Sequence, residues 1–278
     1  MIRSALIPLD GSPSSERAVE LAVKLTRFEK IKLYGLGIID EPGITRPAGA
    51  APGGSAFKEE RDEALLEDAQ ARVDQFLARF KSQCEEEDVP HETRIVAENP
   101  YQAVVDQAEL HDLIIIGRQT NFFFETEEQT GKTFRQLVHD SPRPVLATAE
   151  TLPELTDDVL ICYDGSNQAA RALQMFTALF VHHAPNIHII TVAETKRRAE
   201  DICRRAAIFL EEHGACVCSH PLELDGKPWG AILGQVEVLK PRMLVLGAYG
   251  KSGLRKYFFG STTAEMIEEC AHPLFIYH

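Results

Sequence analysis

The sequence has little that would tie it to a membrane or a nucleic acid. No apolar run reaches the roughly 18 residues of a membrane-spanning helix. The first residues also lack the long apolar stretch and small-residue cleavage site of a signal peptide. Basic residues number 29 against 42 acidic ones, and the net charge of −13 argues against a surface that holds nucleic acid or anionic lipid. We therefore expect a cytoplasmic protein whose partner is a small molecule or another protein.

The cysteines are unevenly placed along the chain. Five of the six cysteines lie in the second half, which does not resemble a disulfide framework. Reduced thiols are expected.

The chain repeats itself. Its 278 residues suit two domains of ordinary size, each able to bury its own core. Four pairs of segments recur in the same order in both halves: residues 5–12 and 160–166, the helix-patterned 16–22 and 168–173, 113–117 and 244–247, and 143–146 and 272–275. The order indicates a duplicated domain, with residues 1–150 and 157–278 as the two copies and a polar, proline-containing linker between them.

Within each half, short β-branched runs alternate with helix-patterned segments. Such alternation predicts an α/β fold in which helices cover both faces of a parallel sheet. We expect two tandem, doubly wound, five-stranded parallel sheets of the flavodoxin type. Their ligands should lie at the C-terminal ends of the strands, where Asp10 or Asp164 ends the first strand. The first half is longer because of a Pro- and Gly-rich segment, residues 41–55, interpreted as a mobile loop, and a charged helix over residues 57–87.

A glycine-rich, basic loop follows the fourth strand of the second half. Its glycines let the backbone approach a ligand closely, and it ends in Ser-Thr at a predicted helix start, a position that suits phosphate. An ordinary β–α turn is the alternative, but three glycines with clustered cations favour a phosphate site. The residues assigned to it are Gly247, Gly250, Lys251, Gly260, Ser261 and Thr262.

The spacing Gly247-x2-Gly250-x9-Gly260-Ser261 resembles the ATP-binding signature of the universal stress protein family. The resemblance covers nearly the whole chain and implies a tandem member with the adenine nucleotide alpha hydrolase-like fold. It also implies that the second domain binds ATP or another adenine nucleotide, with or without Mg²⁺. Asp164 would hold the adenosine end, Val192 would pack against adenine, and Leu246 precedes the phosphate loop.

The matching loop of the first half departs from this pattern. Thr120 replaces the second glycine, Gly131 follows after ten residues instead of nine, and Lys132 replaces serine. Three glutamates stand where phosphates would pass, so we assign no nucleotide to this half. The run Phe122-Phe123-Phe124 is interpreted as core or as a lid over the emptied pocket, with an exposed partner patch as the alternative.

A cysteine and histidine cluster in the second half allows a soft-metal site. On a strand, Cys216, Cys218 and His220 would share one face, with His213 nearby and Cys203 as a further ligand. The spacing is not that of a known zinc module, and buried cysteine is common under a helix. No metal site is assigned.

The function expected from these features is a nucleotide-dependent switch that biases contacts with an unknown protein partner. No catalytic residue is identifiable, so the chain is not expected to be an enzyme. The alternative is a slow ATPase or a protein that phosphorylates itself at Ser261, Thr262 or Thr263. A scaffold without any ligand is the third hypothesis.

The last strand of each half, residues 145–147 and 274–277, is apolar and would be exposed at a sheet edge. We expect these strands to pair, giving an internal pseudo-dimer, with a homodimer as the competing arrangement.

Overall fold

The computed structural model describes residues 2–27, 30–46, 55–122, 131–248 and 261–278. Their contacts divide the chain into two compact units, Arg3–Leu137 and Val138–His278, the second of which includes Ile2. We call these the N-terminal unit and the C-terminal unit. This division follows contacts, not sequence repeats, so the domain limits 1–150 and 157–278 stay predictions.

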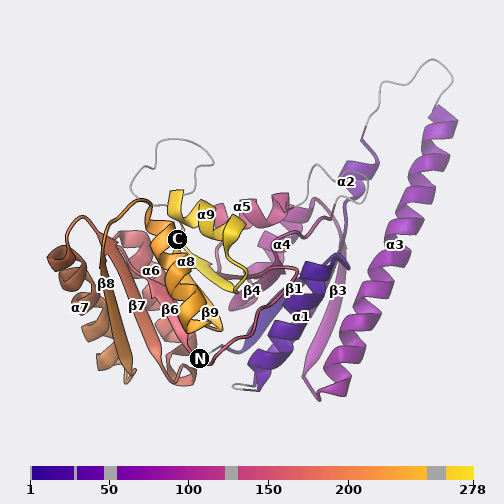
Figure 1. Cartoon of the computed structure of the whole chain (residues 1–278). Helices are drawn as coiled ribbons and strands as arrows, with labels where there is room; N and C mark the ends of the chain where they lie inside the picture. The colour runs from indigo at the N-terminus through magenta and orange to yellow at the C-terminus, as the bar shows by residue number, and fades with distance from the viewer. Residues whose placement is uncertain (1, 28–29, 47–54, 123–130, 249–260) are drawn as a thin grey trace. The chain divides into compact units, whose positions relative to one another are not determined.

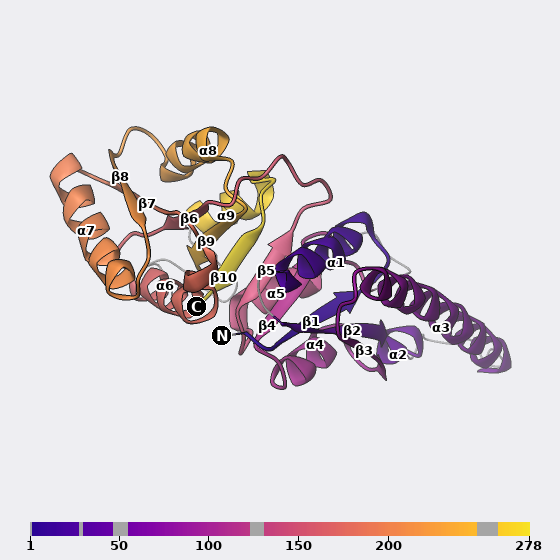
Figure 2. The same cartoon turned by 90° about the horizontal axis from the view of Figure 1, so that it is seen from below.

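The N-terminal unit contains a parallel sheet in the order β3-β2-β1-β4, with helices on both faces (Figures 1 and 2). Helices α1 and α3 contact one face, and α4 packs on the other. Buried aliphatic residues fill β1, β2 and β4, as a sheet covered on both sides requires, whereas the edge strand β3 has no buried residue. Its elements are β1 (Ser4–Leu9), α1 (Pro13–Thr26), β2 (Lys32–Ile39), α2 (Glu41–Ile44), α3 (Ser55–Glu86), β3 (His91–Ala97), α4 (Pro100–Ala108) and β4 (Leu113–Gly117). Helix α5 (Lys132–Asp140) contains the division between the units.

The C-terminal unit contains strands in the order β5-β10-β9-β6-β7-β8. Helices α6 and α7 pack on one face, while α8 and α9 contact each other on the other face (Figure 2). Its elements are β5 (Val145–Thr148), β6 (Val159–Cys162), α6 (Asn167–Phe180), a 3-10 turn (Val181–His183), β7 (Ile187–Ala193), α7 (Lys196–Glu212), β8 (Val217–Glu223), α8 (Pro228–Leu239), β9 (Met243–Gly247), α9 (Ser261–Glu269) and β10 (Leu274–Tyr277). The predicted doubly wound α/β fold is confirmed.

Strand β5 pairs with β10 inside the C-terminal unit, and this pair is antiparallel. Leu274 lies opposite Ala147, and Phe275 lies opposite Leu146. The expected pairing of these two strands is confirmed. The ring of Phe275 packs edge-on against Phe180, with 5.8 Å between ring centroids, so this strand also contributes to the core. Association between domains, or between two copies of the chain, stays a prediction.

Of the two predictions for the segments that lengthen the first half, the long helix is found and the loop is found only in part. The predicted long helix is α3, 32 residues from Ser55 to Glu86. The predicted loop over residues 41–55 begins instead with a short helix, α2, because the carboxylate of Asp40 caps it by accepting a hydrogen bond from Gly43 N at 3.1 Å. Residues 47–54 lie outside the described part of the chain.

Within the described ranges, no helix is both long enough and apolar enough to span a membrane.

Candidate functional site

Asp164 lies in the turn between β6 and α6, at the C-terminal end of the strand. Its Oδ1 accepts a hydrogen bond from Ser166 N at 2.8 Å, and Gly165 between them has a φ of +77°. Ser166 is the N-cap of α6, since its hydroxyl oxygen accepts a hydrogen bond from Ala169 N at 3.2 Å. Asp164 therefore forms an Asx turn and leaves the capping to its neighbour. Its side chain is exposed at the strand end, where a ligand can reach it.

Gly247 joins three elements at the same end of the sheet. An added Cβ would lie 2.6 Å from both Ala169 N and the carbonyl carbon of Gln168, so the first turn of α6 packs directly on this glycine. Its carbonyl oxygen accepts a hydrogen bond from the Thr263 hydroxyl, in α9, at 3.1 Å. Gly247 thus holds β9, α6 and α9 together. The sequence motif did not assign Thr263 to this site, although its position in the Ser-Thr-Thr run was a signal for it.

The remaining predicted site residues have different surroundings. Val192 is half-buried at the end of β7, next to the end of β6 in the sheet. The side chain of Leu246 is only 2% exposed, so it packs in the core. Ser261 is the first residue of α9, and Thr262, next in that helix, is half-buried. Gly250, Lys251 and Gly260 lie outside the described residues. The structure thus gathers Asp164, Val192, Gly247 and the start of α9 within one unit, at the C-terminal side of its parallel strands.

Asp10, the equivalent aspartate of the N-terminal unit, is engaged by its own protein. One carboxylate oxygen accepts hydrogen bonds from the backbone N–H and the hydroxyl of Ser12, at 3.0 and 2.7 Å. The other accepts one from Asn121 N at 2.6 Å. Asp10 is 7% exposed, and this burial raises the pKa of its carboxyl group, although the three hydrogen bonds oppose the shift. Asn121 belongs to the loop after β4, so this loop folds over the aspartate.

The same loop contains the residue that replaced the second glycine. The hydroxyl of Thr120 donates a hydrogen bond to the carbonyl oxygen of Gly117 at 2.6 Å, and Thr120 O accepts one from Gly131 N at 3.1 Å. Phe122 is fully buried, in agreement with the core interpretation of the phenylalanine run, while the next two phenylalanines lie outside the described residues. In this unit, the Asp10 carboxylate and the loop after β4 therefore form hydrogen bonds with other residues of the chain, at the place where the other half would bind a ligand.

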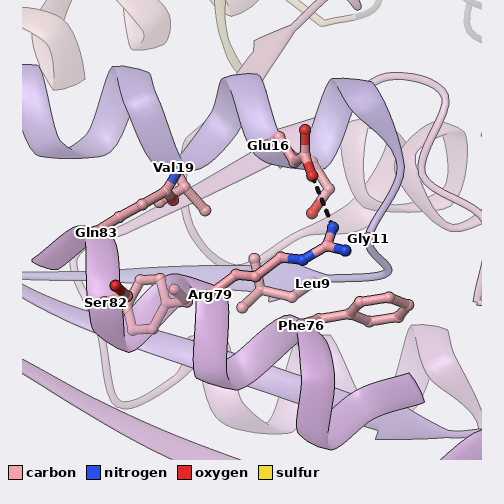
Figure 3. A pocket seen from close by; sticks show the side chains of 10 residues that line it. Leu9, Gly11, Glu16, Val19, Phe76, Arg79, Ser82 and Gln83 are labelled. Carbon is pink, nitrogen blue, oxygen red and sulfur yellow. Dashed lines mark hydrogen bonds and ion pairs between the residues drawn. The ribbon is translucent and has the colours of Figure 1, made fainter.

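A pocket of about 210 Å³ in the N-terminal unit lies between α1 and α3 (Figure 3). The ion pair between Arg79 and Glu16 spans it at 3.1 Å, and Phe76 packs against Gly11 at its end. Both charged side chains are about half exposed. We interpret this pocket as the gap between two packed helices, because its charges already pair with each other.

The structure brings only two of the cysteine and histidine residues considered as metal ligands, Cys218 and His220, into one cluster. Cys218 and His220 lie on the same face of β8, and His188 of β7 joins them. Cys203 is on the opposite side of β7, where its thiol lies 3.2 Å from Thr191 Oγ1, and burial raises its pKa. The ring of His213 donates a hydrogen bond to Phe209 O at the end of α7. The sequence could not indicate His188, because it lies 30 residues before its neighbour in the sheet.

Comparison with known proteins agrees with this architecture. A universal stress protein of Synechocystis sp. is 27% identical over 168 residues, which make up 59% of this chain and 56% of that protein. The chain therefore spans little more than half the length of this curated relative. A universal stress protein from Archaeoglobus fulgidus has a TM-score of 0.68 at 22% identity, over 98% of this chain and 97% of that chain. A functionally unknown protein from Pseudomonas aeruginosa has a TM-score of 0.60 at 16% identity, over 99% and 92%. At such identities the two structures show a shared fold alone.

The model of the universal stress protein family matches residues 1–148 and 204–278, in agreement with a tandem arrangement. The stretch between the two matches contains Asp164 and Val192, so the roles of these two residues stay predictions. The matched residues make up well over half of the sequence. The chain therefore belongs to the universal stress protein family.

Proposed function

We propose that the C-terminal unit binds one adenine nucleotide at the C-terminal ends of β6, β7 and β9, and that this nucleotide is ATP. The observation that carries the proposal is that the two equivalent aspartates differ in burial and in hydrogen bonding. Asp10 is buried under its own loop with both oxygens engaged. Asp164 is exposed, and among the described residues only Ser166 N engages its carboxylate. A carboxylate at this end of a parallel sheet can accept hydrogen bonds from a sugar or a base.

The surroundings of Asp164 fit the rest of a nucleotide. The contact of Gly247 with the first turn of α6 fixes the end of β9 beside the Asp164 turn. Helix α9 begins at Ser261, and the N–H groups at a helix start favour phosphate. The sequence spacing Gly247-x2-Gly250-x9-Gly260-Ser261 supplies the glycines and cations between these two points. Mg²⁺ would accompany the phosphates, as it does for nucleotides in general.

We further propose that the bound nucleotide acts as a switch for contacts with a protein partner and is not turned over rapidly. Slow hydrolysis or self-phosphorylation is the second candidate. Thr263 is a poor acceptor for a phosphoryl group, because it is 7% exposed and its hydroxyl is bonded to the Gly247 carbonyl. Thr262, half-buried in the first turn of α9, is the better one.

Calorimetric titration of the full chain with ATP tests the binding proposal. We expect one ATP per chain, a loss of about tenfold or more in affinity for Asp164→Ala, corresponding to roughly 1.4 kcal/mol, and no binding for Gly260→Glu. Asp10→Ala is the matched control and should bind as the wild type does. Two ATP per chain, or a loss confined to Asp10→Ala, would contradict the assignment to the C-terminal unit.

Mass spectrometry of the nucleotide that the purified chain retains identifies the natural ligand. Release of phosphate from ATP, measured with the wild type and with Thr262→Ala, separates the switch from the enzyme. A turnover that depends on the intact site would favour the ATPase, and phosphate on the protein would favour self-phosphorylation.

A further inference from the structure

Three potential metal ligands lie together on β7 and β8 of the C-terminal unit. His188 is in parallel register with Cys218, and Ile190 with His220, so the three side chains share one face of the sheet. This face is opposite the one that α7 covers, since α7 packs against the alternate residues Ile189 and Thr191. The cluster is therefore separate from the buried thiol of Cys203.

The cluster is also separate from the proposed nucleotide site. His188 is the second residue of β7, while Val192 lies near its other end. Four residues of strand correspond to about 13 Å. Asp158, which directly precedes β6, lies next to His188 at this end. The ligands thus gather toward the N-terminal side of the strands, and nucleotides bind at the C-terminal side.

The distances among the three side chains are close to those of a coordination sphere. One ligand atom from each of His188, Cys218 and His220 lies within 4.8 Å of the other two. His188 Nδ1 and His220 Nε2 are 2.8 Å apart, a distance at which the two rings share one proton. Around a tetrahedral zinc ion, ligand nitrogens are about 3.3 Å apart and a nitrogen and a thiolate about 3.6 Å. Replacing the shared proton by an ion therefore requires the rings to separate by roughly half an ångström.

The other nitrogen of His188 has the partner that metal-binding histidines commonly have. His188 Nε2 lies 3.5 Å from Asp158 Oδ2, and Asp158 Oδ1 accepts a hydrogen bond from the side-chain amide of Asn186 at 2.9 Å. A carboxylate at one ring nitrogen favours the proton there and leaves the lone pair of the other nitrogen for an ion. Here that second nitrogen, Nδ1, is the one directed at His220.

We propose that His188, His220 and Cys218 bind a thiophilic divalent cation, with Zn²⁺ as the best match and Asp158 as the residue that orients His188. Two imidazole nitrogens and one thiolate suit zinc, whereas Mg²⁺ and Ca²⁺ prefer oxygen ligands. Cys218 is exposed, so the fourth position is open to water or to an external ligand. On binding, His220 exchanges its proton from Nε2 to Nδ1 through solvent and stays neutral, the thiol proton of Cys218 passes to solvent, and no electron is transferred.

Such an ion would join the edge strand of this unit to its neighbour. In the described part of the C-terminal unit, β8 ends the strand order and pairs with β7 alone. A cation bound by residues of both strands stabilises the folded unit by mass action, in proportion to its concentration over its dissociation constant. The site would therefore couple metal availability to the stability of this unit.

The test uses the full chain without a histidine tag, stripped with a chelator, kept in a non-thiol reductant and free of nucleotide. Equilibrium dialysis against Zn²⁺ should give one ion per chain. Titration with Co²⁺ should give the visible bands of a tetrahedral ion and the near-ultraviolet band of a cobalt–thiolate bond.

Variants assign the ligands. His220→Ala and His188→Ala should lose stoichiometric binding, and Cys218→Ser should lose the thiolate band. Asp158→Asn should weaken binding by about 10- to 100-fold, as removal of an orienting carboxylate does. Cys216→Ser is the matched control, because Cys216 is also an exposed thiol, lies two residues away and is outside the cluster.

Circular dichroism separates misfolding from loss of a ligand, and the exposed Cys218→Ser variant is expected to fold in any case. The proposal is overturned if the wild type binds no Zn²⁺, if Cys218→Ser keeps the thiolate band, or if Cys216→Ser loses it. Zinc binding that persists in Asp164→Ala would show that this site does not depend on the nucleotide site.

Discussion

Replacing Gly247 with alanine should destabilise the C-terminal unit even when no nucleotide is present. The added methyl group would lie 2.6 Å from Ala169 N and from the carbonyl carbon of Gln168, and both are backbone atoms that cannot rotate away. Ala169 N is also the group that the Ser166 side chain caps. The methyl group would therefore push apart β9 and α6 and strain the cap of α6 at the same time.

The magnitude follows from these two contacts. Overpacking of this kind costs about 1–3 kcal/mol, and a lost N-cap costs about 1 kcal/mol. We expect a total of about 2–4 kcal/mol, which for a unit of this size corresponds to a fall in melting temperature of roughly 5–15 °C.

The fluorescence of Trp229 during thermal unfolding reports on the stability of the C-terminal unit. It is the only tryptophan of the sequence and lies in α8 of the same unit. Gly234→Ala is the matched control, because Gly234 is exposed within α8 and a Cβ there would meet nothing within 4 Å. Alanine in an exposed helix is more stable than glycine by about 0.5–1 kcal/mol. A melting temperature of Gly247→Ala equal to that of the wild type would refute the reasoning and leave a ligand contact as the reason for this glycine.

Two further perturbations test the hydrogen bonds around the two strand ends. Thr263→Val removes the hydroxyl that donates a hydrogen bond to the Gly247 carbonyl, so it should lower the unfolding free energy by about 1 kcal/mol. Urea unfolding followed by the fluorescence of Trp229 would measure this loss. An unchanged unfolding midpoint would mean that this bond contributes nothing to stability. Asp10→Asn tests the raised pKa of Asp10, which means that the folded state favours the protonated carboxyl group more than the unfolded state does. The penalty for ionising it is absent below the unfolded pKa of about 3.9 and grows as the pH rises through the folded value. The unfolding free energy of the wild type minus that of Asp10→Asn should therefore fall as the pH rises above about 4. Hydrogen exchange of the β1 amides in both proteins would measure this difference. A difference that rises over this pH range would contradict a raised pKa for Asp10.

Local patterns determined the fold class and much of the candidate site. Alternating β-branched runs and helical periods dictated a parallel sheet with helices on both faces, and strand ends of a parallel sheet meet on one side. The repeated Asp-Gly-Ser turn therefore located Asp10 and Asp164, and the apolar runs near 145 and 274 indicated two strands in need of a partner. These features depend on neighbours in the sequence, so the sequence alone sufficed.

Tertiary contacts decided what those residues do. The sequence gives both aspartates the same turn, yet Asp10 is covered by Asn121, 111 residues later, while Asp164 remains exposed. The sequence motif assigns Gly247 to the ligand, but Gly247 and its counterpart Gly117 both leave room for the first turn of a helix, which only packing shows. His188 became a partner of Cys218 and His220 through the register of β7 and β8. Register, burial and contacts between distant segments are set by the free energy of the whole fold, and no local pattern encodes them.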